Sequence, residues 1–483
     1  GRRGRHDGVL PWPARAPIGA RPAAPPRNDD PAPEGLELTL YRCPKVHDGR
    51  FANNAWLQEL PEFTTKLTWG NALLVAPRTA AELGLAQEDV VLVEHGDAST
   101  KATVHVAPGQ ARGSLALALG YGRVRAGVVG GSAAEGVEPV GDDATPLRRG
   151  PELLVAGGVR VTRTGARATL AATQEHHLID AVGMEGREAR LGDLVREGTL
   201  AEYLDHPDFA QHAVHHPPLE SLWKEHEYDE GHRWGMAIDL GSCTGCNACV
   251  VACQAENNIP VVGKDEVRRG REMHWIRMDV YYAGEPDDPR ATTQPVACQH
   301  CENAPCEQVC PVAATVHSSE GLNDMVYNRC IGTRYCANNC PYKVRRFNFF
   351  DYNAELEGEE NELLRLGKNP EVTVRSRGVM EKCTFCVQRI QTTRAEARRE
   401  GRELGRDEVR TACQQVCPTR AITFGDLNDS ESLVARRHAS PRSYELLGEL
   451  NVKPRTAYLA RVTNPSPALE APAEHDDRHS HDG

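Results

Sequence analysis

Fifteen of the 16 cysteines in this 483-residue chain lie between residues 243 and 417, in four closely spaced groups. The groups are Cys243, Cys246, Cys249 and Cys253; Cys298, Cys301, Cys306 and Cys310; Cys330, Cys336 and Cys340; and Cys383, Cys386, Cys413 and Cys417. A proline follows the last cysteine of every group except the first, where Gln254 stands instead. Thiolates at intervals of two and three residues are typical ligands of iron–sulfur clusters and of zinc.

The spacing within the groups favours cubane iron–sulfur clusters over single zinc ions. Three cysteines on a tight loop can bind three corners of one cluster, while a fourth, three residues later on an opening helix, points away and binds the other cluster of a pair. Four such groups then form two interlocked pairs of clusters. Zinc needs closed sets of four ligands, so a structural zinc-binding scaffold is the alternative that this repetition disfavours.

The third group lacks one thiol. Regular spacing places a cysteine at position 333, where the chain has Thr333. A hydroxyl is a poor ligand for iron compared with a thiolate, so we predict a three-iron cluster that has lost its unligated corner. The alternative is a four-iron cluster whose odd iron binds water or hydroxide. The predicted cofactors are therefore three [4Fe-4S] clusters and one [3Fe-4S] cluster.

Basic residues flank the cysteine groups. Lys343, Arg345 and Arg346 follow the third group, and Lys382 precedes Cys383. Positive charge beside an anionic cluster stabilises it and raises its reduction potential. The alternative for these residues is an ordinary solvated charged face.

Composition and missing motifs exclude several other functions. The net charge of −12 argues against nucleic acid as a partner, because phosphate binding needs a positive field. The chain has no Cys-x-x-Cys-His haem motif, phosphate-binding loop, dinucleotide-binding spacing or nucleophile–base arrangement, so no catalytic site of its own is evident. The isolated Cys43 is expected to be an ordinary thiol.

No apolar run approaches the roughly 18 residues of a membrane span, so any membrane attachment is expected to come from a partner. The chain begins with Gly1, and no signal-peptide pattern follows. We therefore expect this start to be the interior of a longer polypeptide.

The elements that position the cysteines are predicted from composition and periodicity. We expect a Pro-rich linker at 1–34, a mostly β domain at 35–175, a connector at 176–234, the cysteine domain at 235–430, an ordered tail at 431–463 and a disordered tail at 464–483. Within the cysteine domain, residues 354–378 form a charged insertion and residues 387–403 a surface helix.

The β domain shows strands separated by turn residues. The predicted strands are Ala72–Ala76, Val90–Glu94, Ala102–Val106 and Ser114–Leu119. Between the first two, Thr79 and Glu82 predict a capping box, and Gly84 predicts the end of a short helix.

The connector carries four histidines without a clean ligand spacing. They are His206, His212, His215 and His216, and we expect a solvated loop here in preference to a metal site.

The cysteine domain resembles the ferredoxin-like electron-transfer subunits of the complex iron–sulfur molybdoenzyme family, which includes polysulfide, dimethyl sulfoxide and nitrate reductases. The matching stretches are 243–249, 298–306, 340–352 and 382–386. The β domain resembles the C-terminal cofactor-binding barrel of molybdopterin oxidoreductases, through residues 53–61, 66–69 and 79–93. The fusion of the two, with 221–226 and 231–239 leading into the first cysteine group, is similar to the iron–sulfur subunit of bacterial alternative complex III.

This resemblance implies an α+β multidomain fold, in which a molybdopterin-dinucleotide-binding-like barrel precedes a double bacterial-ferredoxin-like domain with four clusters. The resemblance also implies which cysteines share a cluster. Three clusters have four ligands each: Cys243, Cys246, Cys249 and Cys417; Cys383, Cys386, Cys413 and Cys253; and Cys298, Cys301, Cys306 and Cys340. The three-iron cluster has three ligands: Cys330, Cys336 and Cys310. The departure at Gln254, where the family has proline, puts the local helix start in doubt.

The function implied is a relay of electrons from quinol toward c-type haems. The implied partners are a membrane-embedded quinol-binding subunit and c-type haem subunits, at the periplasmic face of the membrane. The fused barrel is expected to lack a molybdenum cofactor. The alternative is the electron-transfer part of a catalytic molybdoenzyme that acts on a sulfur or nitrogen oxide.

Overall fold

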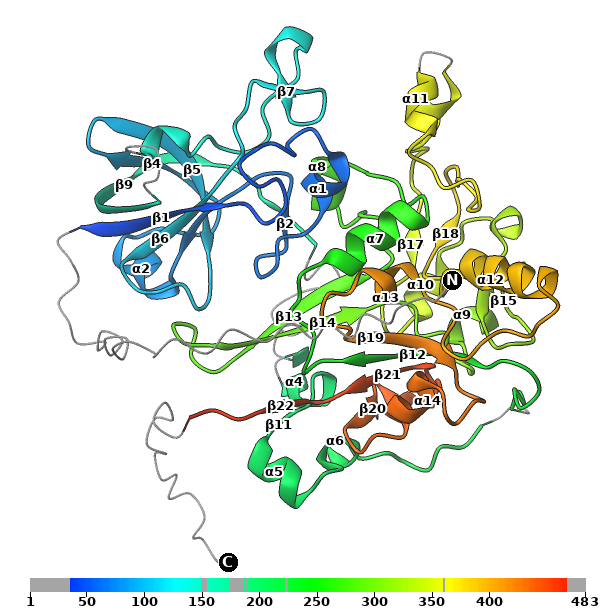
Figure 1. The fold of residues 1–483 in the computed structure, drawn as a ribbon. Helices are drawn as coiled ribbons and strands as arrows, with labels where there is room; N and C mark the ends of the chain where they lie inside the picture. The colour runs from blue at the N-terminus through cyan, green and yellow to red at the C-terminus, as the bar shows by residue number, and fades with distance from the viewer. Residues whose placement is uncertain are drawn as a thin grey trace, which may run out of the picture.

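The computed structural model describes residues 35–148, 154–173, 186–187, 189–221, 225–358 and 361–466. The predicted linker at 1–34 and most of the predicted tail at 464–483 lie outside these residues. The described chain has two bodies, a barrel near the N-terminal end and a larger body that carries the cysteine groups (Figure 1).

Six strands close the barrel in the order β1-β6-β3-β5-β4-β9. They are β1 (Leu36–Arg42), β3 (Leu73–Val75), β4 (Asp89–His95), β5 (Ala98–Val106), β6 (Ser114–Leu119) and β9 (Val155–Arg167). The pairs β1–β6 and β3–β5 are parallel, and the other pairs are antiparallel. Inward-facing residues such as Leu38, Val91 and Leu117 are fully buried and form the barrel core. The four strands predicted from the sequence are confirmed.

The predicted capping box is wrong. Helix α2 (Pro77–Glu82) begins three residues earlier than the capping box requires, with Ala76 as its N-cap in place of Thr79, because Pro77 at the first helical position has a preset φ. The Thr79 hydroxyl lies inside the helix and accepts a hydrogen bond from the Gly113 N–H at 2.9 Å. The predicted helix end is confirmed, because Gly84 has φ +63°.

A four-stranded sheet in the order β19-β12-β21-β20 lies in the cysteine-bearing body (Figure 1). Its strands are β12 (Trp234–Asp239), β19 (Ile422–Asp426), β20 (Ser443–Glu445) and β21 (Thr456–Leu459). The central strand β12 is buried at every position and pairs with β21 in parallel and β19 in antiparallel fashion. Residues on both sides of the cysteine groups in the chain therefore meet in one sheet.

Short elements connect the cysteine groups. Two-stranded sheets are formed by β13 (Arg277–Ala283) with β14 (Arg290–Val296), β15 (Thr315–His317) with β16 (Asn323–Met325), and β17 (Arg346–Phe347) with β18 (Met380–Glu381). The helices are α7 (Ala248–Glu256), α8 (Lys264–Arg268), α9 (Pro305–Gln308), α10 (Tyr335–Asn339), α11 (Glu362–Arg365), α12 (Val387–Arg399), α13 (Ala412–Val416) and α14 (Leu433–His438).

The surface helix predicted at 387–403 is confirmed as α12, with an earlier end. Gly401 has φ +68°, and the Arg402 N–H bonds back to the Ala397 carbonyl at 3.0 Å. This is the Schellman arrangement that closes a helix, and it explains why the helical turn ends at Arg399.

The chain segment that links the barrel to the first cysteine group in the sequence also forms regular structure. It contains α4 (Leu191–Leu194), β11 (Glu197–Thr199), α5 (Leu200–Asp205) and α6 (Phe209–His212), and β11 pairs in parallel with β22 (Arg461–Thr463). The four predicted solvated histidines of this segment are exposed, and His212 lies in α6.

Hydrogen bonds join the cysteine-bearing body to the barrel side, by which we mean α1 (Ala55–Glu59) and the residues directly after it. The Asn247 side chain donates to the Pro61 carbonyl at 2.7 Å. The buried Glu59 carboxylate accepts from the backbone N–H groups of Val262, at 3.0 Å, and Gly263, at 2.8 Å. These contacts hold the first cysteine group against the N-terminal half of the chain.

None of the described helices combines the length and apolar character that a passage across a lipid bilayer needs.

Candidate iron–sulfur cluster sites

The four cysteine loops share one backbone feature. In each, the residue directly before the second ligand position has a left-handed backbone, with φ +67° at Gly245, +48° at His300, +75° at Gly332 and +54° at Phe385. The following residues are Cys246, Cys301, Thr333 and Cys386. The backbone therefore places Thr333 at the position that a cysteine takes in the other three loops.

The first and third loops agree further. A second left-handed residue follows, Asn247 with φ +58° and Arg334 with φ +61°, and each is the N-cap of the next helix. The third ligand positions, Cys249 in α7 and Cys336 in α10, are buried near the starts of these helices. The loops are thus local repeats, and the third differs in its missing thiol.

The last cysteine of a group lies where its helix ends. Cys340 and Cys417 are the C-caps of α10 and α13, with extended backbones at ψ 115° and 111°. The following proline excludes the helical conformation from the residue before it and so forces this ending. The sequence reasoning expected this cysteine on an opening helix, and the structure shows that the helix closes there.

The sulfur of the last cysteine accepts a hydrogen bond from the residue four positions later. The Ala314 N–H donates to Cys310 Sγ at 3.2 Å, and the Ala421 N–H donates to Cys417 Sγ at 3.3 Å. Burial raises the pKa of Cys417, but backbone N–H donors outweigh burial, and the net pKa is lowered. These donors stabilise a thiolate at the position where a ligand is needed.

In the first group a side-chain amide, in place of a backbone N–H, donates to the sulfur of the last cysteine. Since Gln254 replaces proline, α7 continues through Cys253 to Glu256. The side-chain amide of Asn257, again four residues later, donates to Cys253 Sγ at 3.5 Å and to its carbonyl at 3.0 Å. Gln254 therefore changes the backbone at this group, while a donor still reaches the sulfur.

Two of the four predicted ligand sets each line one cavity. One set, which we call site 3, consists of Cys298, Cys301, Cys306 and Cys340. The other, site 4, consists of Cys310, Cys330 and Cys336, and Thr333 also lines this cavity. Arg345 lines both cavities, so sites 3 and 4 are neighbours.

The remaining cysteines gather in two further sets. Site 1 consists of Cys243, Cys246, Cys249 and Cys417, and site 2 of Cys253, Cys383, Cys386 and Cys413. At site 1, burial raises the pKa of Cys249 well above its usual value, and the charges of the other three members raise it as well. At site 2, burial raises the pKa of Cys253 well above its usual value, and the charges of the other three members raise it further. Such mutual effects require that the thiols of each set lie close together.

The four sites form a row. Besides burial, the charge of Cys413 of site 2 raises the pKa of Cys249 of site 1. Burial also raises the pKa of Cys383 of site 2, and the charge of Cys298 of site 3 adds to that rise. Site 4 then adjoins site 3 through Arg345. The order along the row is therefore 1, 2, 3, 4.

The donor sets fit iron–sulfur clusters better than single ions. In a cubane each thiolate binds a different iron, so its ligands surround a cavity, as the cysteines of sites 3 and 4 do. Buried thiols with raised pKa values must lose their protons when a cluster binds.

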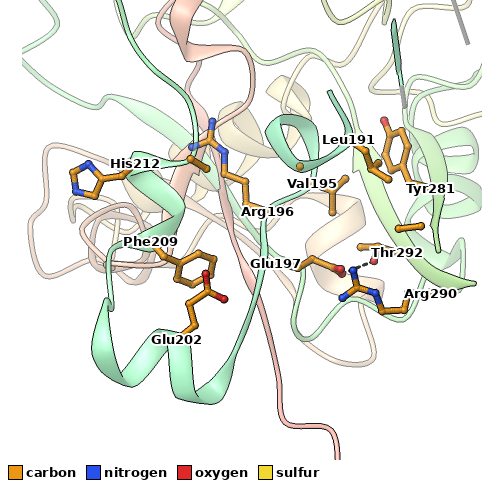
Figure 2. A pocket seen from close by; sticks show the side chains of 13 residues that line it. Leu191, Val195, Arg196, Glu197, Glu202, Phe209, His212, Tyr281, Arg290 and Thr292 are labelled. Atoms are coloured by element: carbon orange, nitrogen blue, oxygen red, sulfur yellow. Dashed lines mark hydrogen bonds between the residues drawn. The ribbon is translucent and has the colours of Figure 1, made fainter. Parts of the chain in front are cut away.

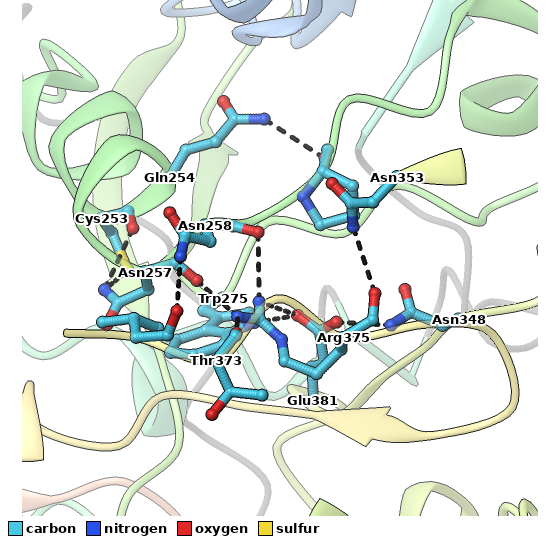
Figure 3. Close-up of polar contacts among 12 residues, drawn as sticks. Cys253, Gln254, Asn257, Asn258, Trp275, Asn348, Asn353, Thr373, Arg375 and Glu381 are labelled. Atoms are coloured by element: carbon cyan, nitrogen blue, oxygen red, sulfur yellow. Dashed lines mark hydrogen bonds and ion pairs between the residues drawn. The ribbon is translucent and has the colours of Figure 1, made fainter. Parts of the chain in front are cut away.

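A buried polar network supports site 2 (Figure 3). Arg375 pairs with Glu381 at 2.6 Å, and both side chains are almost fully buried. Trp275 Nε1 also donates to Glu381, at 3.1 Å, and Arg375 donates to the Asn257 carbonyl at 2.8 Å. The network thus fixes Asn257, whose amide contacts the Cys253 sulfur.

Of the flanking basic residues, Arg345 and Lys382 are buried next to cysteines, whereas two others are engaged elsewhere. Arg346 pairs with Glu272 at 2.9 Å, and the Lys343 ammonium bonds to the Asn338 carbonyl near the surface. The isolated Cys43 is buried, with its sulfur 3.1 Å from the Tyr121 hydroxyl.

A separate cavity of about 420 Å³ lies beside the hairpin β13–β14 (Figure 2). Arg196, Phe209, Tyr281 and Thr292 are among the residues that line it, and no cysteine is. It therefore belongs to none of the four sites.

Sequence reasoning missed His300, Phe385, Asn257 and Asn323. The amide oxygen of Asn323 lies 3.9 Å from Cys306 Sγ, and this residue comes from β16, outside every cysteine group. His300 and Phe385 lie within the groups, and their place directly before a ligand cysteine is the signal that could have drawn attention to them.

The 4Fe-4S dicluster domain family matches residues 242–314 and 329–421, and a second family of that description matches 290–355. Among curated relatives, the menaquinone reductase iron–sulfur cluster-binding subunit of Nitratidesulfovibrio vulgaris is 42% identical over 47% of this chain and 89% of its own length. The Hdr-like menaquinol oxidoreductase iron–sulfur subunit 1 of Archaeoglobus fulgidus is 33% identical over 48% and 85%. The iron–sulfur subunit of the arsenate respiratory reductase of a Shewanella species is 30% identical over 47% and 96%.

A solved structure of acetylene hydratase from Pelobacter acetylenicus is similar over 27% of this chain and 18% of that chain, at 17% identity and a TM-score of 0.21, which is too low to support an argument. About half of this chain matches the curated relatives nearly end to end. By these matches, and by the four repeated cysteine loops, the chain belongs to the family of iron–sulfur subunits of the molybdoenzyme electron-transfer type.

Proposed function

We propose that this chain relays electrons from quinol through one [3Fe-4S] and three [4Fe-4S] clusters toward c-type haem subunits. The observation that carries the proposal is the row of four cysteine sets, in which each set adjoins the next. Bound clusters supply one-electron carriers. The protein residues provide the thiolates, exclude water from the buried sulfurs and hold neighbouring sites together.

Site 4 is proposed to hold the three-iron cluster. Three cysteines line its cavity, and the second ligand position of the repeated loop is taken by the exposed Thr333. A thiolate set of three leaves one corner of a cubane without a protein ligand. The proposed assignment of the other sites is a four-iron cluster on each set of four cysteines.

Site 4 is also proposed as the point where electrons arrive from quinol. The loop residues between its cysteines carry exposed apolar side chains, since Ile331 is 66% and Tyr335 is 53% exposed. Exposed apolar residues that gather beside a redox site are suited to contact with a partner. We propose that this partner is a membrane-embedded quinol-binding subunit, and that the chain lies at the outer face of the membrane.

The names of relatives support the quinol assignment. Two of them are named as subunits of a menaquinone reductase and a menaquinol oxidoreductase. The barrel fused to a four-site domain supports a finer proposal, that the parent complex is of the alternative complex III type and that the barrel lacks molybdenum. The experiment is to purify the complex anaerobically and add quinol, which is expected to reduce the clusters; clusters that stay oxidised would contradict the proposal.

The second candidate is the electron-transfer part of a catalytic molybdoenzyme. The observation that favours it is a relative named as the iron–sulfur subunit of an arsenate respiratory reductase. Metal analysis of the full-length protein separates the two functions. One molybdenum per chain would support the catalytic alternative, and iron without molybdenum would support the relay in a quinol oxidoreductase.

A further inference from the structure

We propose that Arg345 and Lys382 are built-in counter-charges, each shared by two neighbouring clusters, and that they raise the reduction potentials of sites 2, 3 and 4 together. This inference rests on the proposed function only in taking the four cysteine sets to hold clusters. It goes beyond that function because it assigns the control of potential to two particular cations and says which pair of sites each one governs.

Arg345 lies at the junction of sites 3 and 4. The residue is 6% exposed and lines the cavities of both. One end of the guanidinium donates to the Thr315 hydroxyl and the Asn323 amide oxygen, each at 3.5 Å, and the other end contacts Met325 Sδ at 3.4 Å. All three partners are neutral, and the two contacts to oxygen are long for hydrogen bonds.

Arg345 thus has no carboxylate within ion-pair distance among the described residues, and its buried Nε has no protein partner. A buried cation without a counter-ion is unfavourable, so the charge must be balanced by another group. Burial lowers the pKa of Arg345, but the charges of Cys306, Cys336, Cys298 and Cys340 outweigh burial and raise it. The anions that face this guanidinium therefore belong to sites 3 and 4.

Lys382 takes the corresponding place between sites 2 and 3, where His300 of the site 3 loop stacks on Phe385 of the site 2 loop with ring centroids 3.8 Å apart. Its side chain is fully buried, and its ammonium donates to the carbonyl of Cys383, a member of site 2, at 2.9 Å. Burial raises the pKa of Cys306, a member of site 3, to about 11, and the charges of both Arg345 and Lys382 oppose that rise. Burial lowers the pKa of His300, which lies between two cysteines of site 3, and the charge of Lys382 lowers it further.

Lys382 also has no carboxylate within ion-pair distance in the described part of the chain. Nearby cations show the contrast. Arg346, the direct neighbour of Arg345, is neutralised by Glu272 at 2.9 Å, and Arg375 is neutralised by Glu381 at 2.6 Å. The two cations at the junctions lack such a paired carboxylate. Burial raises the pKa of Asp324, and the charge of Lys382 lowers it, so Asp324 is a further group on which the charge of Lys382 acts.

A positive charge shared by two clusters stabilises the reduced form of each, because reduction adds a negative charge to both. The potentials of the two clusters then rise together, and the difference between them changes little. By this arrangement Arg345 raises the potentials of sites 4 and 3, and Lys382 raises those of sites 3 and 2.

The test is a redox titration of the cluster-loaded full chain with chemical mediators, followed by electron paramagnetic resonance, for Arg345→Met and Lys382→Met. We expect Arg345→Met to lower the potentials of sites 3 and 4, and Lys382→Met those of sites 2 and 3. The expected shift corresponds to about a tenfold change in the ratio of reduced to oxidised cluster at a fixed applied potential, ~59 mV for one electron. Lys343→Met, which removes an ammonium at the surface, is the matched control and is expected to shift the potentials little.

Charge-preserving variants separate charge from packing. Arg345→Lys and Lys382→Arg are expected to keep potentials close to those of the original chain. If a Met variant loses its two clusters while the charge-preserving variant keeps them, the counter-charge role is supported. Loaded Met variants with unchanged potentials, or the same loss from both kinds of variant, would overturn it. Since mediators and not quinol supply the electrons, failure of the quinol relay would appear separately, as clusters that quinol does not reduce.

Discussion

The imidazole of His300 stacks on the phenyl ring of Phe385 with ring centroids 3.8 Å apart and an interplanar angle of 22°. His300 directly precedes Cys301 of site 3, and Phe385 directly precedes Cys386 of site 2. Both residues have a left-handed backbone, which glycine takes at the matching positions of the other two loops. The stacked pair therefore joins the loops of two neighbouring sites by side-chain packing.

We predict that Phe385→Ala destabilises the cysteine-bearing body by roughly 3–5 kcal/mol, because the ring is 1% exposed and its removal leaves a cavity. The measurement is the guanidinium concentration at which the visible absorbance of the clusters is lost, under anaerobic conditions. Phe350→Ala is the control, because that ring is 50% exposed and is expected to change the midpoint little. Equal effects of the two variants would contradict a packing role for Phe385.

We predict that Asn257→Leu lowers the reduction potential of the cluster at site 2. The variant removes the amide donor that contacts Cys253 Sγ at 3.5 Å, and hydrogen bonds to ligand sulfurs help to set cluster potentials. The measurement is a redox titration followed by electron paramagnetic resonance. Asn428→Leu is the control, since its amide bonds to the carbonyls of Tyr228 and Gly231 and to no sulfur. An unshifted potential in a fully loaded Asn257 variant would show that this contact does not matter for redox behaviour.

We predict that the contact between the barrel side and the cysteine-bearing body weakens as the pH rises from about 4.5 to 7. Burial raises the pKa of Glu59 to about 7, although Gly263 N–H, Trp69 Nε1–H and Val262 N–H stabilise its carboxylate. The folded state then holds a proton that the unfolded state loses at lower pH, so stability falls across this window, by roughly 3 kcal/mol at most, and is constant above it. Thermal unfolding at several pH values measures the effect.

Glu59→Gln is expected to flatten this pH profile, because the amide does not titrate. The exposed Glu355→Gln is the matched control and is expected to leave the profile as it is. A Glu59→Gln profile that falls as steeply as that of the original chain would show that another group causes the dependence.

We predict that Thr333→Cys converts site 4 to a four-iron site. The backbone at this position matches that of Cys246, with Gly332 before it and Arg334 after it in left-handed conformations, so a cysteine side chain enters the same place in the loop. The iron content is expected to rise by about one per chain, and the signal of an oxidised three-iron cluster is expected to vanish. Thr333→Ser is the control, because a hydroxyl remains a poor ligand. A Thr333→Cys variant with unchanged spectrum and iron content would contradict the assignment of site 4.

Local sequence signals predicted a large part of this structure. The spacing of the cysteines, and the resemblance that extended it, named four ligand sets, and two of them each line one cavity. That the four sets bind clusters stays a prediction. The apolar alternation at Val90–Glu94 predicted β4 within one residue of its ends. Such signals succeed because they depend on neighbouring residues only.

Features that depend on distant partners were not predicted. The Thr79 hydroxyl binds the Gly113 N–H from another part of the barrel, and this contact competes with the capping role that the local pattern favoured. Strand β9 lies mostly exposed and contains two adjacent glycines, so it shows no alternation. The stacking of His300 on Phe385 joins residues 85 positions apart, and no local pattern of either segment indicates it.

The central claim is the row of four clusters with a three-iron cluster at site 4. Electron paramagnetic resonance on the oxidised, cluster-loaded protein, combined with an iron count on the same sample, tests it most directly. We expect about 15 irons per chain and the signal of an oxidised three-iron cluster. About 16 irons without that signal would contradict the assignment of site 4, and zinc in place of iron would contradict the relay itself.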